Sequence, residues 1–362
     1  MEGMMDTTLK SKNSQKASNI VKVLREQILT GMLKPGTRIM SARELSRHFQ
    51  VSQVTANKAL LQLVEDKLIV RNERSGSFVK KNWQAKNHTI GFADNLDVFG
   101  PEIQASCGLY RDTCIRMLYE NNCSVRFLRK DEIPDAVLER DFDGILGYYA
   151  GWDDELMARM KKTGIPVVLG RFDFVLNTPF HQVLPDIYGA VYEVFHRIDR
   201  KQFDGLIIIY EDHDNCLYRR DIALKLAHCI GFEEENIELF KASHLEVEMN
   251  YPLWQDVSRR CRLGRKFIYT CGDNMASGLI RVFRESGVEL GKEIQLASCG
   301  NLEDCGYRPF EEPTITGAGT NYEEYAMAAV RLLMRGLELP EENKFSQITR
   351  VPAVYKKRKT AF

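Results

Sequence analysis

The sequence lacks the long apolar run that a membrane-spanning helix needs. None of its apolar stretches reaches the roughly 18 residues of a span. Its first residues, MEGMMDTTLKSKNSQK, contain no apolar segment of the kind found in a signal peptide. With 362 residues, of which 44% are apolar and 28% charged, the composition is typical of a soluble protein of two or three domains. We therefore expect a cytoplasmic protein with no membrane partner.

Paired cysteine motifs are also missing. The nine cysteines run from Cys107 to Cys305, and no two of them are spaced as CxxC. This scatter predicts small buried thiols in a reducing compartment, rather than disulfides or a zinc site. We expect no metal and no other cofactor.

The common catalytic motifs are absent as well. The chain has no P-loop, no GxGxxG and no GxSxG, and GAGTN at 317–321 lacks the third glycine of a dinucleotide fingerprint. EDHDN at 211–215 places acids around His213, which would suit a metal, but we interpret it as a polar loop after a strand. We therefore predict no catalytic residues and no enzyme activity.

Net charge is zero, but the charge is unevenly placed along the chain. Residues 1–82 contain 15 Lys and Arg against 7 Asp and Glu, whereas residues 83–362 contain 35 against 43. A basic N-terminal module on an acidic body indicates a polyanionic partner for the first part only.

Three helices and a hairpin are predicted in the basic module. The apolar spacing predicts a first helix over 18–30. Ser41, with a glutamate three residues later, forms a capping box that starts the second helix. Ser52 is the expected N-cap of the third. The segment LIVRNERSGSFVKK then predicts two strands with a turn at 72–76, so the module is a winged helix-turn-helix.

The third helix, VSQVTANKALLQL, has an unusual outer face. Its inner face is apolar, but its outer face carries amides and a lysine rather than ion pairs. Amides can bond adenine edges in both directions, and a helix fits the major groove. Hydroxyls and free N–H groups at a helix start can bind phosphate. We interpret this face as a DNA-reading face, although each polar residue alone would also suit an ordinary solvated surface.

The stretch KPGTRIMSARELSRHFQVSQVTANKALLQLVEDKLIVRNERSGSFV resembles the DNA-binding module of the gluconate-repressor (GntR) family. The matching pieces are PG before the second helix, RELS within it, VS..T...AL..L in the third, and a wing ending GSFV. Family members usually have Arg where this chain has Gln53 and Asn57. Because Arg reads guanine well, its absence indicates an operator that leans toward A·T. The expected DNA-contacting residues are Ser41, Arg43, Ser52, Gln53, Thr55, Asn57, Lys58, Arg71, Arg74 and Gly76.

After a polar linker, strands alternate with helices. The first set includes HTIGFAD, a helix near 108–121, SVRFLR, a helix, FDGILGYY, a helix and IPVVLGR. The second set includes QVLPD, a helix from Tyr188, DGLIIIYED, a helix near 219–230, KFIYTCGD, a helix from Ala276 and EIQLASCG. This alternation predicts an α/β fold with two lobes built on parallel sheets.

This second part resembles the effector-binding domain of the lactose/galactose-repressor family, a relative of periplasmic sugar-binding proteins. The resemblance rests on IGFADN, DGILGYY, IPVVLGR, VLPDIYGAVYEVFHRI, YRRDIALKLA and the later segments through RVPAVYKKRKT. It implies two lobes joined by three crossovers, with a ligand in the cleft at the carboxyl ends of the strands. The effector-binding residues that it implies are Asp94, Tyr148, Trp152, Arg171, Arg220, Asp273 and Asn301. Arg219 could take the part of Arg220 if the register is off by one.

These observations predict a bacterial transcription regulator, most simply a repressor. It would bind double-stranded operator DNA as a homodimer and respond to a small effector, first of all a carbohydrate. Two alternatives stay open: a cytoplasmic ligand-binding protein, and a regulator that senses a non-sugar metabolite. An aminotransferase-like body would need a longer chain and a Schiff-base lysine. The expected domains are a frayed N-terminus at 1–15, the winged helix-turn-helix at 16–81, a linker at 82–88 and the effector domain at 89–362.

Overall fold

The computed structural model divides the chain into two compact units, Met1–Asn87 and His88–Phe362, and each is described by itself. The predicted N-terminal segment at 1–15 lies outside the described residues, as does the predicted linker except His88, which opens the first strand of the second unit. The structure describes residues 16–25, 27–28, 32–66, 68–72, 75–80, 88–94, 101–129, 141–148, 154–170, 173–243, 250–291, 294–338 and 345–362.

The first unit is a winged helix-turn-helix. Residues 16–25 and 27–28 are helical, in the region of the predicted first helix. Its sheet has the order β1-β3-β2, and both pairings are antiparallel. The hairpin turns between Asn72 and Gly76, which confirms the predicted turn. The remaining elements are β1 (Arg38–Ile39), α2 (Ala42–His48), α3 (Gln53–Glu65), β2 (Ile69–Asn72) and β3 (Gly76–Val79).

Side-chain caps fix where the two helices of the helix-turn-helix begin. The backbone N–H of Ser41 donates to Glu44 at 2.6 Å, and that of Glu44 donates to the Ser41 hydroxyl at 3.3 Å. The N–H of Thr55 donates to the Ser52 hydroxyl at 3.1 Å. Both caps confirm the predictions, because each satisfies a backbone group that the first turn leaves unpaired. A small aliphatic core then holds the inner faces together, including Leu24, Leu45, Ala56, Ala59, Leu60 and Leu63.

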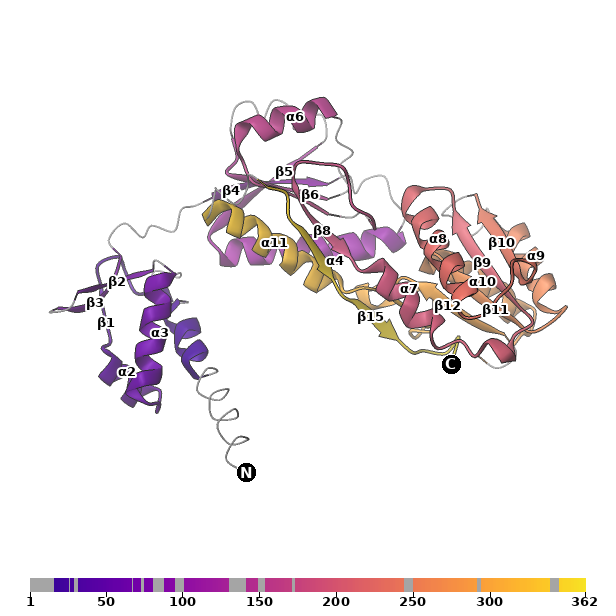
Figure 1. Ribbon diagram of the computed structural model, residues 1–362, viewed down its shortest axis with the longest axis horizontal. Coiled ribbons are helices and arrows are strands. Elements are labelled where there is room, and N and C mark those ends of the chain that lie inside the picture. Colours follow the sequence, from indigo (N-terminus) through magenta and orange to yellow (C-terminus); the bar gives the residue numbers. More distant parts are fainter. Residues whose placement is uncertain are drawn as a thin grey trace. The chain divides into compact units, whose positions relative to one another are not determined.

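The second unit contains two six-stranded sheets (Figure 1). The first lobe is built on the sheet of order β14-β8-β7-β6-β4-β5, in which every pairing is parallel. Helices α4 and α11 pack together on one face of it, and α6 covers the other. The elements are β4 (His88–Asp94), α4 (Pro101–Glu120), β5 (Cys123–Leu128), β6 (Gly144–Tyr148), α6 (Asp154–Thr163), β7 (Val167–Gly170), β8 (His181–Pro185), α11 (Tyr322–Glu338) and β14 (Ile348–Val351).

The second lobe is built on the sheet of order β10-β9-β11-β12-β13-β15. Its pairings are parallel except the last, between β13 and β15. Helices α7 and α8 pack together, as do α9 and α10. The elements are α7 (Ile187–Phe195), β9 (Gly205–Glu211), α8 (Asp214–Cys229), β10 (Ile237–Ala242), α9 (Tyr251–Cys261), β11 (Lys266–Thr270), α10 (Asp273–Glu285), β12 (Gln295–Cys299), β13 (Gly317–Thr320) and β15 (Ala353–Lys356).

The chain passes between the lobes three times. It crosses from β8 to α7, returns from β13 to α11, and crosses again from β14 to β15. These crossings confirm the fold class and the three crossovers that the sequence implied. Because each crossing leaves or enters a strand end, the segments that join the lobes lie beside the carboxyl edges of the sheets.

Several helices begin earlier than the sequence predicts. Helices α4, α8 and α10 start at 101, 214 and 273, where the sequence indicated 108, 219 and 276. They begin with Pro101 and Glu102, Asp214 and Asn215, and Asp273 and Asn274, none of which adds to an apolar pattern, so the periodic signal starts late. The sequence analysis gave no residue range for β10, α9, β13, α11, β14 and β15. The helix that it predicted between 129 and 142 falls on 130–140, outside the described residues.

All nine cysteines are free thiols and seven of them are buried, in line with the predicted buried thiols. Within the described part of the chain, no helix combines the length and apolar character of a membrane span.

Candidate functional sites

The outer face of α3 is exposed at its N-terminal end. The side chains of Gln53, Val54 and Lys58 are exposed, and Asn57 is half-buried. On the opposite face, Ala56 and Ala59 are fully buried. The N-terminal turn of α3 therefore presents amides, an ammonium group and one apolar side chain.

The two hydroxyls at the start of α3 are bonded to each other. Ser52 is exposed, but Thr55 is only 3% exposed, and their hydroxyl oxygens are 2.8 Å apart. The structure thus places Thr55 in the cap of the helix, with its hydroxyl engaged by Ser52. Ser52 keeps an exposed oxygen beside the free N–H groups of the first turn.

The remaining residues expected to contact DNA lie on α2 and the wing. Arg43 and Arg71 are exposed, whereas Ser41 caps α2. Gly76 has a φ of 103°, a conformation that favours glycine, and a Cβ there would lie 3.3 Å from Nε of Arg38. Arg38 is therefore a further exposed cation at the wing, which the sequence analysis did not single out. Arg74 lies outside the described residues.

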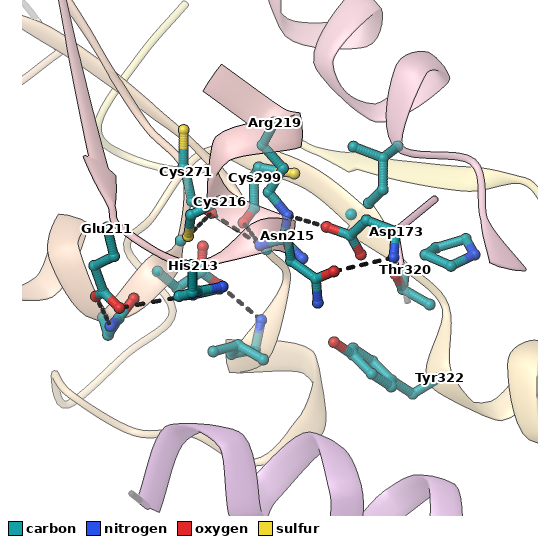
Figure 2. A pocket seen from close by; sticks show the side chains of 18 of the residues that line it. Asp173, Glu211, His213, Asn215, Cys216, Arg219, Cys271, Cys299, Thr320 and Tyr322 are labelled. Carbon is teal, nitrogen blue, oxygen red and sulfur yellow. Dashed lines mark hydrogen bonds and ion pairs between the residues drawn. The ribbon is translucent and has the colours of Figure 1, made fainter. Parts of the chain in front are cut away.

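A cavity of about 250 Å³ lies between the two lobes of the second unit. Tyr148 ends β6, Glu211 ends β9 and Thr320 ends β13, so the cavity lies at the carboxyl ends of the strands, where such sheets bind ligands. Figure 2 shows a row of polar side chains across it, with Tyr322 near one end. The polar and sulfur-bearing side chains in its lining are Tyr148, Asp173, Glu211, His213, Asn215, Cys216, Arg219, Cys271, Asp273, Asn274, Cys299, Thr320, Tyr322 and Tyr325.

An ion pair joins the two lobes across this cavity. Nε of Arg219, on α8, lies 2.5 Å from the Asp173 carboxylate, and both side chains are largely buried (Figure 2). The backbone N–H of Asp173 also donates to the Asn215 side chain at 3.2 Å. Burial lowers the pKa of Arg219, but Asp173 and other neighbouring groups together raise it by more, and the resulting pKa lies well above its ordinary value. Arg219 is therefore a fixed cation that is already paired with a carboxylate.

A second polar group surrounds Glu211. The Asn274 amide donates to Glu211 at 2.9 Å, and Nε2 of His213 lies 3.7 Å from the same carboxylate. His213 precedes α8 as its N-cap. Within the residues that the structure describes, no three His, Cys, Asp or Glu side chains are placed to hold a metal ion.

Asp273 carries an unused acceptor. It is 1% exposed at the N-terminus of α10, where the helix dipole favours a negative charge. One carboxylate oxygen accepts from the N–H of Leu302 at 2.7 Å, but the other, Oδ1, is buried with no hydrogen-bond partner. A Cβ at Gly300 would lie 2.0 Å from Oδ1, so only glycine allows this approach. A buried acceptor without a donor is costly.

Three thiols line the cavity without being reactive. Burial raises the pKa of Cys216 to about 12 and that of Cys299 to about 11, and it raises the pKa of Cys271 well above its ordinary value. Protonated thiols are poor nucleophiles and poor metal ligands. They act here as small apolar surface.

Aromatic rings form the first-lobe side of the cavity. Tyr148 stacks on Tyr110 with ring centroids 4.0 Å apart and planes at 13°. The Tyr325 hydroxyl donates to the carbonyl of Val183 at 2.7 Å, which fixes that ring beside the cavity. Such faces suit the apolar surface of a ring-shaped ligand.

The structure brings two of the expected cleft residues, Tyr148 and Asp273, to the cavity. Arg220 is not part of the lining: it pairs with Asp221 at 2.6 Å and lies 4.9 Å from the Tyr210 ring centroid. Its neighbour Arg219 lines the cavity instead, as the one-residue register shift allowed.

The other expected cleft residues lie elsewhere or outside the description. Asn301 lines a neighbouring cavity of about 280 Å³ and donates to the carbonyl of Val354 at 2.6 Å. Trp152 and Arg171 lie outside the described residues. Asp94 ends β4, and its side chain is not among those described.

Sequence reasoning missed several cavity residues. Glu211, His213 and Asn215 belong to EDHDN, which was interpreted as a plain polar loop. Their signal was available, because this segment begins at the carboxyl end of the strand DGLIIIYED, which faces the cleft. Asp173 and Asn274 also follow strand ends, beside the expected residues Arg171 and Asp273, but their contacts are made with residues distant in the sequence and could not be predicted.

These features define a class of protein: a winged helix-turn-helix with an exposed polar recognition face, followed by a two-lobed α/β body with an interlobe cavity. Comparison with known proteins finds a family match in each of these two parts. Residues 16–79 match the bacterial regulatory proteins of the gntR family, and residues 233–361 match the periplasmic binding protein-like domain. The chain thus combines a GntR-type DNA-binding domain with a periplasmic-binding-protein-like domain, which is the architecture of a transcription regulator.

Two relatives match this chain over different lengths. The chain is 22% identical to the arabinose metabolism transcriptional repressor of Halalkalibacterium halodurans over 300 residues, 75% of this chain and 77% of that protein. It is 43% identical to the mannosyl-D-glycerate transport/metabolism system repressor MngR of Escherichia coli over 58 residues, 16% of this chain and only 24% of that repressor.

Solved structures share the fold of the second unit. A LacI family transcriptional regulator from Enterococcus faecium with bound ribose has a TM-score of 0.62 at 16% identity, over 75% of this chain and 98% of that one. The transcription regulator CcpA of Lactococcus lactis has a TM-score of 0.59 at 16% identity, over 76% of this chain and 100% of that one.

Proposed function

We propose that this protein is a transcription repressor of sugar metabolism that binds operator DNA through α3 and releases it when a carbohydrate occupies the interlobe cavity. The match of residues 16–79 to the gntR family supports the DNA-binding half. The name of the H. halodurans relative, which aligns over 75% of this chain, supports a repressor of sugar metabolism. Cytoplasmic location and a homodimer on a palindromic operator follow as parts of this proposal.

The observation that carries the ligand-sensing half is the unpartnered Oδ1 of Asp273 in the cavity lining. A carbohydrate hydroxyl is a donor that would satisfy it. The aromatic side, with Tyr148, Tyr322 and Tyr325, would take the apolar face of a sugar ring. A hydrogen bond to a charged group contributes about 1.5–3 kcal/mol, which is enough to select a ligand with a correctly placed hydroxyl.

The charge of the cavity favours a neutral sugar over an acidic or phosphorylated one. Among the described residues, the carboxylates of Asp173, Glu211 and Asp273 line it against one guanidinium, that of Arg219. That guanidinium is already paired with Asp173 and also donates to the carbonyl of Cys271 at 2.8 Å. An anionic ligand would therefore meet unneutralised negative charge at short range.

Both lobes contribute to the cavity, which gives the ligand a route to the rest of the protein. Tyr148 and Asp173 come from the first lobe, and Arg219 and Asp273 come from the second. A ligand that contacts both lobes binds one lobe geometry better than another, so it shifts the population between them. By linkage, the same shift changes operator affinity if the DNA-binding domains follow the lobes.

The experiment is a thermal-shift screen of the full chain against neutral pentoses and hexoses, each beside its uronic acid and its phosphate ester. A ligand that binds only the folded state raises the unfolding temperature by mass action. We expect stabilisation by at least one neutral sugar and by neither charged form of it. Asp273→Asn keeps the shape but replaces the unpartnered acceptor with an amide, and it should lose that stabilisation. Stabilisation by anionic members alone would contradict the proposal.

A further inference from the structure

One apolar side chain stands out on the polar end of α3. Val54 is 67% exposed in the first turn, and it follows Gln53, which is also exposed. At 3.6 residues per turn, Val54 lies between Asn57 and Lys58 around the helix, in the middle of the outer face. A single exposed valine is ordinary on a protein surface. Its position, in the centre of an amide-rich recognition face, is what requires an explanation.

The chemistry of the base edges supplies an explanation for the exposed valine. In the major groove an A·T pair presents the N7 acceptor and N6 donor of adenine, then the O4 acceptor and C5-methyl group of thymine. The amides of Gln53 and Asn57 suit the adenine half. The only apolar feature of the four base pairs in this groove is the thymine methyl, and an apolar side chain is its natural contact.

Geometry places Val54 where such a contact is made. In a helix-turn-helix the N-terminal residues of the recognition helix reach the base edges. Val54 is the second residue of α3, two residues after the N-cap Ser52, whereas the other exposed apolar residue of this helix, Leu61, lies two turns further along. A β-branched valine also has a restricted rotamer, so little entropy is lost on contact.

We propose that Val54 is a specificity-determining residue that contacts the C5-methyl group of one thymine in each operator half-site. This inference rests on the DNA-binding function proposed above. It goes further because it names an apolar contact and the base that it selects. Together with the amides, it makes α3 a reader of A·T pairs through both bases of the pair.

The test begins with selection of preferred duplexes from a random pool by the full chain. Each thymine of the selected operator is then replaced by deoxyuridine, which removes only the methyl group. We expect one thymine per half-site at which this change weakens binding by about fourfold, the factor that one buried methylene-sized contact gives. The other thymines should tolerate the replacement.

Variants then assign the contact to its residue. Val54→Ala, an exposed change to a better helix former, should bind the thymine and deoxyuridine operators equally. Leu61→Ala is the matched control and should keep the wild-type ratio. No methyl-sensitive thymine in the wild-type protein, or an unchanged ratio in Val54→Ala, would overturn the assignment while leaving the proposed function intact. If the full chain binds no duplex sequence-specifically, the proposed function fails and this assignment fails with it.

Discussion

The two units differ in where their candidate binding residues lie: on an exposed helix face in the first, and around a buried cavity in the second. In the first unit the core is small and aliphatic, and the polar residues of interest project from the outer face of α3. In the second unit the polar residues of interest, such as Asp273 and Glu211, are buried around a cavity. A surface that reads a rigid duplex needs only exposed side chains on a fixed helix. The cavity of the second unit buries charged groups, and buried charge needs partners.

This comparison predicts that single changes act on stability in the second unit and on recognition in the first. Arg219→Ala should give the largest effect. It leaves Asp173 in the cavity without its cation, and breaking such a largely buried pair costs about 3–5 kcal/mol. Denaturant unfolding of the full chain measures the loss, and the ligand response should disappear as well.

The adjacent arginine provides the control. Arg220 pairs with Asp221, whose side chain is exposed, and exposed pairs contribute about 0–1 kcal/mol. Arg220→Ala should therefore stay within about 1 kcal/mol of the parent and keep its ligand response. Equal losses in the two variants would contradict the distinction between a buried pair that joins the lobes and a surface pair.

Asn57→Ala tests recognition in the first unit. Loss of a bidentate amide contact should cost about 1–3 kcal/mol on the preferred operator and far less on random duplex. Fluorescence anisotropy with both duplexes measures the difference. Gln62→Ala is the matched control, because Gln62 lies at the far end of α3 and bonds Asp66 at 3.2 Å. An equal loss on both duplexes would make Asn57 a backbone contact rather than a base contact.

The capping box of α2 predicts a smaller effect on stability. Ser41→Ala should destabilise the first unit by about 1 kcal/mol in thermal unfolding. The bonds from Ser41 also hold the pKa of Glu44 below its ordinary value of 4.5. Because the folded-state pKa is the lower one, this contribution is present above pH 4.5 and is lost as the pH falls through the folded-state pKa. The first cause of the lowered pKa is the backbone N–H of residue 41, which Ser41→Ala keeps, so this variant should retain most of the acid-dependent loss. Glu44→Gln removes the titrating group and should abolish that loss; a loss that persists in Glu44→Gln would assign it to another residue.

The smallest expected change concerns salt. Arg43 is exposed on α2, and we predict that it contacts phosphate. Arg43→Ala should weaken binding to all duplexes alike and reduce the slope of log affinity against log salt by about one unit. A loss confined to the preferred operator would instead make Arg43 a base-reading residue.

The same comparison explains how much could be predicted from the sequence. The caps at Ser41 and Ser52 and the inner stripe of α3 are local patterns, so they were predicted correctly. Strands β4, β6 and β9 were found as apolar runs. The pairing of Arg219 with Asp173 was not predicted, because the two residues belong to different lobes and are 46 positions apart in the sequence. Helix α8 begins with polar residues, so its apolar periodicity cannot place the helix to within one residue. That precision would be needed to choose Arg219 over Arg220.

The central claim is that a small carbohydrate bound in the cavity changes the affinity of the protein for DNA. The direct measurement is anisotropy of the full chain on its selected operator, titrated with the neutral sugars of the thermal-shift panel. The account predicts that at least one sugar lowers operator affinity by about fivefold or more in the parent protein, and that Asp273→Asn binds the operator normally but does not respond. Operator affinity that no sugar changes, or an equal response in Asp273→Asn, would contradict it.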